Sequence, residues 1–353
     1  MRREIVTFVL AVFAAGVLVN LALSYPTAPS SSEGDGGAAP FFGKERVNVA
    51  GLGGDYQELT VSGRDDKKKI ALLALDRPID AGTAVSSTGL TVEDFVAVLA
   101  KAKKDDAVKA VVLYVDSPGG GVYASYQLSQ AVKDFRDSGK SLYVSIGGIG
   151  ASGAYYASAF AQKIFATPES LVGSIGVIAE VPVVTGLMDK AGIKVYTFKT
   201  GEYKDAGSPF RDMDEKDRAY YQAIIDGMFD RFVRTVSEGR GIPVESVHTF
   251  ADGRVFPAAE AQRLGLVDGI ASLEQVIRLA EEEAGISEGK AKIVTYAPKR
   301  DFLDLLSAFS GFPFAHFPLS LERIAPPPQT TFVLRPGELY YLAPEVAYRW
   351  MYR

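Results

Sequence analysis

Strand-like and helix-like segments alternate along the middle of the sequence, and this alternation restricts the fold more than any other feature. The pattern predicts strands at 69–75, 108–115, 140–146, 163–166, 175–179 and 194–198, and helices at 91–103, 123–138, 185–191, 213–240, 257–264 and 273–284. The run Val108–Val115 is almost entirely apolar, as expected for a strand buried on both faces. Such strands occur in parallel sheets covered by helices, so the expected fold class is α/β.

Size, charge and cysteine content exclude several classes of protein. With 353 residues, of which 47% are hydrophobic and 23% charged, the chain can bury a complete core. The formal net charge is -5 and there is no long run of Lys and Arg, so nucleic acid is not an expected partner. The absence of Cys removes thiol nucleophiles, cysteine zinc sites and disulfides.

The N-terminal region predicts attachment to a membrane. Ile5–Ser24 contains about 20 residues without a charge, enough for a helix to cross a hydrocarbon core of roughly 30 Å. Arg2 and Arg3 precede this run, which favours a cytoplasmic N-terminus. We therefore expect a single-pass anchor in the cell membrane at residues 1–24 and an extracytoplasmic body; a cleaved secretory signal is the alternative.

Composition divides the rest of the chain into three parts. Residues 25–45 are rich in Pro, Ser and Gly and are expected to form a flexible stalk, and residues 46–300 should form the globular domain. Residues 301–353 hold many aromatic side chains and the triple proline Pro326–Pro328. We expect this extension to pack on its own domain or on a neighbouring subunit; contact with a membrane surface and occupation of the protein's own substrate groove are alternatives.

A candidate nucleophile, Ser152, lies in the sequence GIGASGAYY (Gly148–Tyr156), between a predicted strand and an Ala-rich helical pattern. Small neighbours leave its hydroxyl accessible at a helix N-terminus. There, backbone amides and the positive end of the helix dipole face any developing negative charge. Taken alone, the same small residues would equally suit close packing of a helix on a sheet.

A second glycine-rich motif, DSPGGG (Asp116–Gly121), follows the buried strand at its C-terminal end, where α/β proteins bind ligands. We expect the amides of Gly119 and Gly153 to form an oxyanion hole. An ordinary glycine turn is the alternative, and the motif lacks the GK[ST] sequence of a phosphate-binding loop.

Few residues could act as the base for a serine nucleophile. The chain has only two histidines, His248 and His316, both far from Ser152 in sequence, so a Ser-His-Asp triad is not expected. Lysine remains, and Lys199 and Lys204 both lie in the loop KTGEYKDAGSPF. A lysine becomes a base only where its surroundings keep it uncharged near neutral pH.

The surroundings of Lys204 in the sequence favour and oppose this role. Small and aromatic neighbours could desolvate the amine, whereas the adjacent Asp205 would stabilise its charge unless that carboxylate points elsewhere. Ser174, in VGSIGV, is a candidate hydroxyl for holding the lysine amine. The sequence does not decide between Lys199 and Lys204.

Five motifs together resemble one family. They are DSPGG, GASGAYYASA, ESLVGSIGV, GEYKDAGSPFR, and GRVF followed by LGLVDG. In order and spacing, over about residues 65–285, this set is similar to the half-length bacterial or archaeal signal peptide peptidases of the SppA family. The resemblance implies a ClpP/crotonase-like core with a Ser-Lys dyad: Ser152 as nucleophile, Lys204 as general base, Ser174 orienting the lysine, and Gly119 and Gly153 supplying the oxyanion amides.

The same resemblance implies how the protein works as an assembly. Family members are membrane-anchored serine endopeptidases without a metal or organic cofactor, and they degrade hydrophobic signal peptides left in the membrane. They form ring-shaped homo-oligomers, here expected to be octamers, in which the lysine of one protomer reaches the serine of the next. Two other functions remain open: a crotonase-like acyl-CoA enzyme, disfavoured because CoA is cytoplasmic, and a non-catalytic membrane scaffold on the same fold.

Overall fold

The structure, a computed structural model, describes residues 56–299 and 340–342. The predicted anchor, the predicted stalk and most of the C-terminal extension lie outside these residues. Among the described residues, no helix combines the length and the hydropathy needed to cross a bilayer.

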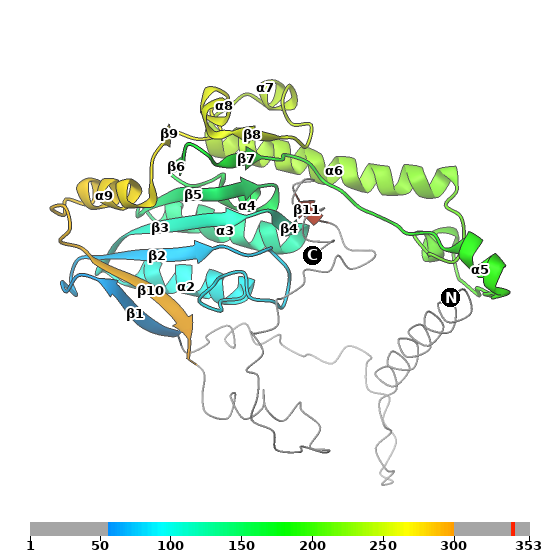
Figure 1. Ribbon diagram of the computed structural model, residues 1–353, viewed down its shortest axis with the longest axis horizontal. Coiled ribbons are helices and arrows are strands. Elements are labelled where there is room, and N and C mark those ends of the chain that lie inside the picture. Colours follow the sequence, from blue (N-terminus) through cyan, green and yellow to red (C-terminus); the bar gives the residue numbers. More distant parts are fainter. Residues whose placement is uncertain (1–55, 300–339, 343–353) are drawn as a thin grey trace, which may run out of the picture. The chain divides into compact units, whose positions relative to one another are not determined.

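One mostly parallel sheet of nine strands organises the described domain (Figure 1). The order along the sheet is β1-β10-β2-β3-β5-β6-β9, with β7 beside β5 and β8 beside β7. The strands are β1 (Tyr56–Ser62), β2 (Lys69–Leu75), β3 (Val108–Ser117), β5 (Ser141–Ala151), β6 (Lys163–Ala166), β7 (Leu171–Gly173), β8 (Val255–Pro257), β9 (Gly269–Ile270) and β10 (Lys292–Pro298). All neighbours from β10 to β9 are parallel, and only β1 and β8 run antiparallel to theirs. The predicted α/β class is confirmed.

Helices cover both faces of this sheet. They are α2 (Val92–Lys104), α3 (Val122–Asp137), α4 (Gly153–Ser158), α5 (Thr185–Ala191), α6 (Glu215–Arg240), α7 (Val244–His248), α8 (Ala258–Arg263) and α9 (Leu273–Glu283). Ile70 and Val112 belong to the apolar cluster under α9. Their neighbours Ala71 and Leu113 belong to the larger cluster under α2, α3 and α4, since successive strand residues point to opposite faces. Burial on both faces explains the apolar strands of the sequence.

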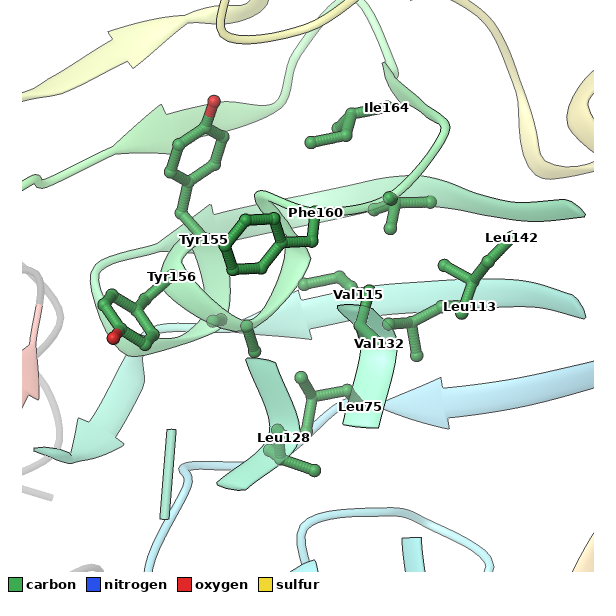
Figure 2. Close-up of a cluster of buried hydrophobic side chains, with 14 of the residues drawn as sticks. Leu75, Leu113, Val115, Leu128, Val132, Leu142, Tyr155, Tyr156, Phe160 and Ile164 are labelled. Carbon is green, nitrogen blue, oxygen red and sulfur yellow. The ribbon is translucent and has the colours of Figure 1, made fainter. Parts of the chain in front are cut away.

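The larger cluster fixes α4 in place. Figure 2 shows Tyr155, Tyr156 and Phe160 around α4, in one cluster with Leu128 and Val132 of α3 and with side chains of the central strands. Every residue of α4 is buried. Burying one such large side chain stabilises a fold by about 1.5–3 kcal/mol, so this short helix is firmly seated.

Local capping signals explain why several helices begin where the sequence predicts. The backbone amide of Asp94 donates to the Thr91 hydroxyl at 3.2 Å, and the Thr91 amide donates to the Asp94 carboxylate at 3.0 Å. Asp214 and Asp217 form the same reciprocal box at the start of α6, and Gly241 ends that helix in the left-handed conformation. Such boxes satisfy amides that have no partner within the helix.

Two predicted strands, 175–179 and 194–198, are wrong: neither segment joins the sheet. The strand next to the end of β5 is instead β7, just before the first of these segments. In the second segment Tyr196 and Phe198 are 78% and 95% exposed. Strand preference mainly reflects packing against a neighbouring strand, and within the described chain neither segment has one.

Candidate active site

Ser152 occupies the turn between β5 and α4, in a conformation that few residues other than glycine adopt. Its φ is 54° and its ψ is -122°, and its amide donates to the Gly173 carbonyl at 2.7 Å. Only one other non-glycine residue in the described part, Ser174, has a positive φ. Such a backbone costs of order 1–3 kcal/mol and persists only where the surroundings enforce it, as the buried α4 does here.

The Ser152 hydroxyl is buried and lacks a hydrogen-bond partner among the described residues. A buried polar group without a partner costs about 1–3 kcal/mol. Ser152 therefore combines a strained backbone with an unsatisfied hydroxyl, two features with a cost to folding and no structural benefit in the described chain. Residues of this kind gather at functional sites.

The pairing of β3 with β5 brings the DSPGGG motif to the same end of the sheet. Ser117 pairs with Gly150, and Gly150 lies two residues before Ser152 in the chain. Gly119 follows in β4 (Gly119–Gly121) with a φ of 97°, and its amide donates to the Ser117 hydroxyl at 3.3 Å. A hydrogen bond of that length is weak, so this amide could exchange the hydroxyl for a stronger acceptor.

The Gly153 amide directly follows the candidate nucleophile in the chain. Gly153 is the first residue of α4, so its N–H precedes the intrahelical hydrogen bonds and remains available at the positive end of the helix. The two predicted oxyanion residues, Gly119 and Gly153, thus lie in elements that contact each other, β4 and α4. Both flank the turn that carries Ser152.

Ser174 is also brought to this site. Gly173 pairs with Ala151, the residue before Ser152, and Ser174 follows directly with a φ of 49°. Its side chain is buried, and its amide donates to the Arg254 carbonyl at 2.8 Å. The two serines with positive φ therefore sit at the ends of adjacent parallel strands.

Lys204 is placed differently from the other predicted residues. It is exposed, in the 3₁₀ helix η2 (Glu202–Asp205), and within the described chain no hydrogen bond or ion pair holds its amine. The loop around it is attached to the first turns of α6. The attachments are an ion pair between Lys216 and Glu202, an ion pair between Arg211 and Asp217, a ring contact between Tyr203 and Tyr220 at 5.2 Å, and a hydrogen bond from the Tyr221 hydroxyl to the Ala206 carbonyl at 3.2 Å.

Helix α6 separates this loop from Ser152 in the same chain. Its C-terminal part is buried, and the Phe232 ring packs edge-on against Tyr156 of α4 with centroids 5.0 Å apart. Tyr220, beside the lysine loop, lies about 18 Å along the helix axis from Phe232 at a rise of 1.5 Å per residue. The structure therefore gathers Gly119, Ser152, Gly153 and Ser174, and leaves Lys204 of the same chain apart from them.

Lys199 and Asp205 clarify the choice between the two lysines. The Lys199 amine donates to the Asp205 carboxylate at 2.6 Å and to the Glu202 carbonyl at 2.9 Å. Arg211 donates to the same carboxylate at 3.0 Å. Hydrogen bonds from Lys199 and Arg211 lower the pKa of Asp205. Asp205 is thus engaged away from Lys204, as the sequence argument required, and the Lys199 amine is held in an ion pair with it.

The histidines do not form an alternative site within the described residues. His248 ends helix α7, and its exposed ring contacts Phe229 with centroids 5.8 Å apart. His316 lies outside the described residues. Within the described ranges, no group of three or more His, Cys, Asp or Glu side chains could hold a metal ion.

Two positioning residues were missed by the sequence argument, although both lie in the motif that it selected. The Asp116 carboxylate accepts a hydrogen bond from the Ile149 amide at 3.0 Å and so connects the DSPGGG turn to the serine turn. Ser117 donates to the Arg77 carbonyl at 2.7 Å while accepting from Gly119. The signal was the presence of two polar residues directly before the glycines, at the end of a buried strand.

Known proteins with similar sequences agree with this site. The model of peptidase family S49 matches residues 134–287. An Enterococcus faecium protein named "Putative signal peptide peptidase SppA" is 33% identical over 260 residues, which are 73% of this chain and 74% of that protein. A Synechocystis protein named as a "Putative protease" is 35% identical over 65% of this chain and 79% of its own length.

A third relative, from Methanocaldococcus jannaschii and also named as a "Putative protease", is 40% identical over 202 residues, or 57% of this chain. The match covers 64% of that protein, slightly less than two thirds of its length. The other two relatives exceed 30% identity over more than two thirds of their lengths, which confirms the family expected from the motifs. The chain therefore belongs to peptidase family S49, and it is a serine protease.

Proposed function

We propose that this chain is a membrane-anchored serine endopeptidase in which Ser152 is the nucleophile and Lys204 of a neighbouring protomer is the general base. The observation that supports this most strongly is the buried Ser152 hydroxyl, which has a positive φ and no hydrogen-bond partner in the described chain. A base supplied by a second protomer would satisfy that hydroxyl on assembly.

In the proposed reaction the uncharged Lys204 amine takes the hydroxyl proton as Ser152 Oγ bonds to a peptide carbonyl carbon. The carbonyl oxygen gains the negative charge and accepts hydrogen bonds from the Gly119 and Gly153 amides, each worth about 3 kcal/mol in the transition state. Collapse of the intermediate breaks the C–N bond, and Lys204 returns the proton to the leaving amine. Water then attacks the acyl carbon and gives its proton to the same amine; the ester bond to Ser152 Oγ breaks, and the amine returns the proton to Oγ. Ser174 orients that amine.

Assembly is part of the proposal because the dyad is incomplete within one chain. The segment from 178 to 210 carries a series of exposed large apolar side chains: Ile178, Val183, Leu187, Ile193, Val195, Tyr196, Phe198, Tyr203 and Phe210. Exposed apolar surface on this scale is typical of a protein–protein interface. We propose that it packs on a neighbouring copy in a ring, for which eight protomers are expected, and carries Lys204 to that copy's Ser152.

The proposed substrates are hydrophobic peptides, above all signal peptides left in the membrane after secretion. The name of the Enterococcus relative, the apolar run at Ile5–Ser24 and the stalk composition of residues 25–45 support this proposal. A catalytic domain outside the cytoplasm and attached to the bilayer would remain close to such peptides. The mostly parallel sheet and its covering helices support assignment of the core to the ClpP/crotonase superfold.

The test compares two buried serines that both lack a hydrogen-bond partner among the described residues, Ser152 and Ser145 of β5. Full-length Ser152→Ala should hydrolyse casein and a signal peptide about 10⁴-fold or more slowly than wild type, because the nucleophile is lost. Ser145→Ala should retain wild-type kcat/KM, since its hydroxyl lies within the strand, before the catalytic turn. A serine-reactive phosphonate should label wild type and Ser145→Ala and leave Ser152→Ala unlabelled. Labelling of Ser152→Ala, or full hydrolysis by it, would refute the assignment of the nucleophile.

A further inference from the structure

Arg240, the last residue of α6, attaches that helix to the sheet. Its side chain is only 5% exposed, and it donates to the Asp268 carboxylate at 2.7 Å and to the Gly265 carbonyl at 3.3 Å. The Asp268 carboxylate also accepts from the Ile164 amide of β6 at 2.7 Å, and the Asp268 amide donates to the Ile164 carbonyl at 2.7 Å. A buried cation is stable only where it is paired and hydrogen-bonded, so the end of α6 has one well-defined position against β6.

Residues 265–268 also hold the helix that follows the nucleophile. The Tyr155 hydroxyl of α4 donates to the Leu266 carbonyl at 2.8 Å, and both groups are buried. Helix α4 begins directly after Ser152, whereas the loop that carries Lys204 is attached to the first turns of α6. The two helices connected to the proposed dyad are therefore both bonded to the same four residues.

Helix α6 is buried mainly at the end that Arg240 holds. In its first two thirds Asp217 is the only buried residue, and the other buried residues are Phe232, Val233, Thr235 and Val236. At a rise of 1.5 Å per residue, the part before Phe232 is about 25 Å long and the part from Phe232 to Arg240 about 12 Å long. If the helix turned about its contact at Phe232, a shift of about 1 Å at Arg240 would move the far end by about 2 Å.

We propose that Arg240 is a positioning residue for catalysis: by fixing the end of α6 to residues 265–268, it determines where Lys204 meets the Ser152 of the neighbouring protomer. This inference rests on the proposed function, because it takes Lys204 as the base of a neighbour's site. Arg240 contacts neither substrate nor reacting atoms, and it acts only through the helix.

The guanidinium group suits this role better than an amine would. Its donors lie in a rigid planar fork, so Arg240 bonds Gly265 and Asp268 together and fixes the orientation of the helix end as well as its distance. Catalytic groups must be held to within about 0.5 Å, and a misplacement of 1 Å can cost about 100-fold in rate. Arg240→Met should therefore lower kcat about 10- to 100-fold at unchanged KM, and Arg240→Lys should cause a smaller loss.

The test uses mixed assemblies of the full-length chain, because they separate the two contributions of each protomer. In a mixture of Ser152→Ala and Lys204→Ala chains, every complete site takes its lysine from the first variant and its serine from the second. Arg240→Met on the Ser152→Ala chain should lower kcat for a signal peptide about 10- to 100-fold relative to the unmodified mixture. The same substitution on the Lys204→Ala chain should leave kcat and KM within about twofold, because the lysine of that chain is absent.

Two control variants separate positioning from general damage to the fold. Tyr155→Phe removes the bond between α4 and the same four residues, so it should lower kcat only when it is on the Lys204→Ala chain, which supplies the serine. Arg234→Met makes the same substitution at an exposed position of α6 and should have no effect on either chain. Arg240→Lys keeps a cation beside Asp268 and takes the place of Arg240→Met if that variant does not assemble.

The outcomes distinguish this inference from the proposed function. Equal losses from the two placements of Arg240→Met would show that Arg240 supports the fold as a whole. No loss from either placement, or a loss confined to the serine-supplying chain, would show that it does not position the lysine. Each of these results overturns the inference and leaves the proposed function standing, since the unmodified mixture is active. If the unmodified mixture is inactive although the two chains assemble together, the shared dyad is wrong and the inference is wrong with it.

Discussion

Mixing two inactive variants tests whether the dyad is shared between protomers. Ser152→Ala retains every lysine, and Lys204→Ala retains every serine. The lysine loop is attached beside Tyr220, whereas Phe232 packs against Tyr156 close to Ser152. These two contacts are separated by about 18 Å along the axis of α6, which is more than the length of a lysine side chain. Assemblies of either variant alone should therefore be inactive, and mixed assemblies should regain activity.

The size of the recovery follows from the geometry of a ring. A site is complete only where a protomer with an intact Ser152 receives the lysine of a neighbour with an intact Lys204. In a random one-to-one mixture each condition holds for half of the protomers, so about one quarter of the sites should be complete, because each head-to-tail interface contributes one lysine to one serine. At other ratios the recovery should follow the product of the two fractions.

The two variants are given different tags and co-expressed, and the mixed assemblies are purified in detergent. Titration with a serine-reactive phosphonate then measures the number of complete sites directly. Hydrolysis of a signal peptide by the same samples should follow the titration. Each variant assembled alone provides the background. If mixtures at all ratios remain at background while the tags show mixed assemblies, the lysine does not act on a neighbour's serine.

Two further predictions concern the elements that support the site. Gly239→Ala would place a Cβ 2.3 Å from the Ala159 carbonyl oxygen and should lower the melting temperature. Gly227→Ala is the control: its Cβ would have no atom within 4 Å, so it should be neutral or stabilise α6 by up to about 1 kcal/mol. Thermal melting of both variants checks this prediction, and equal effects would contradict it. A hydrogen bond from Arg211 lowers the pKa of Asp217, so this pair stabilises the lysine loop above the ordinary aspartate pKa and is lost as pH falls through the lowered value. Amide protection factors in residues 199–212 should therefore decrease as pH is lowered from about 5 to below about 4, and constant protection would show that the pair does not hold the loop.

The sequence predicted those parts of the fold whose signals are local. The start of α2 follows from Thr91 and Asp94, which cap the helix by themselves, and the central strands follow from apolar runs that only burial explains. The segments 175–179 and 194–198 have strand-like composition, but whether they form strands depends on a neighbour that the described chain does not provide. Composition alone cannot distinguish a strand from a segment that lacks a partner.

The candidate site likewise has features that local motifs predict and features that depend on tertiary structure. Ser152 and Gly119 were predictable because each lies in a motif at the end of a strand. The unsatisfied state of the Ser152 hydroxyl and the bond between Gly119 and Ser117 depend on register and burial, which no motif encodes. The assignment of Lys204 is still a proposal, because its role depends on a second copy of the chain.

The energetic cost concentrated at Ser152 explains why a shared dyad would suit this fold. The positive φ and the unpartnered hydroxyl each cost of order 1–3 kcal/mol, and the buried helix α4 holds both in place before any base arrives. A base from a neighbouring protomer would give the Ser152 hydroxyl a hydrogen-bond partner only on assembly. Part of the free energy of assembly would then come from removing the cost of the unpartnered hydroxyl in the monomer. The length of α6 then has a function, because it holds the lysine loop beyond the reach of its own serine.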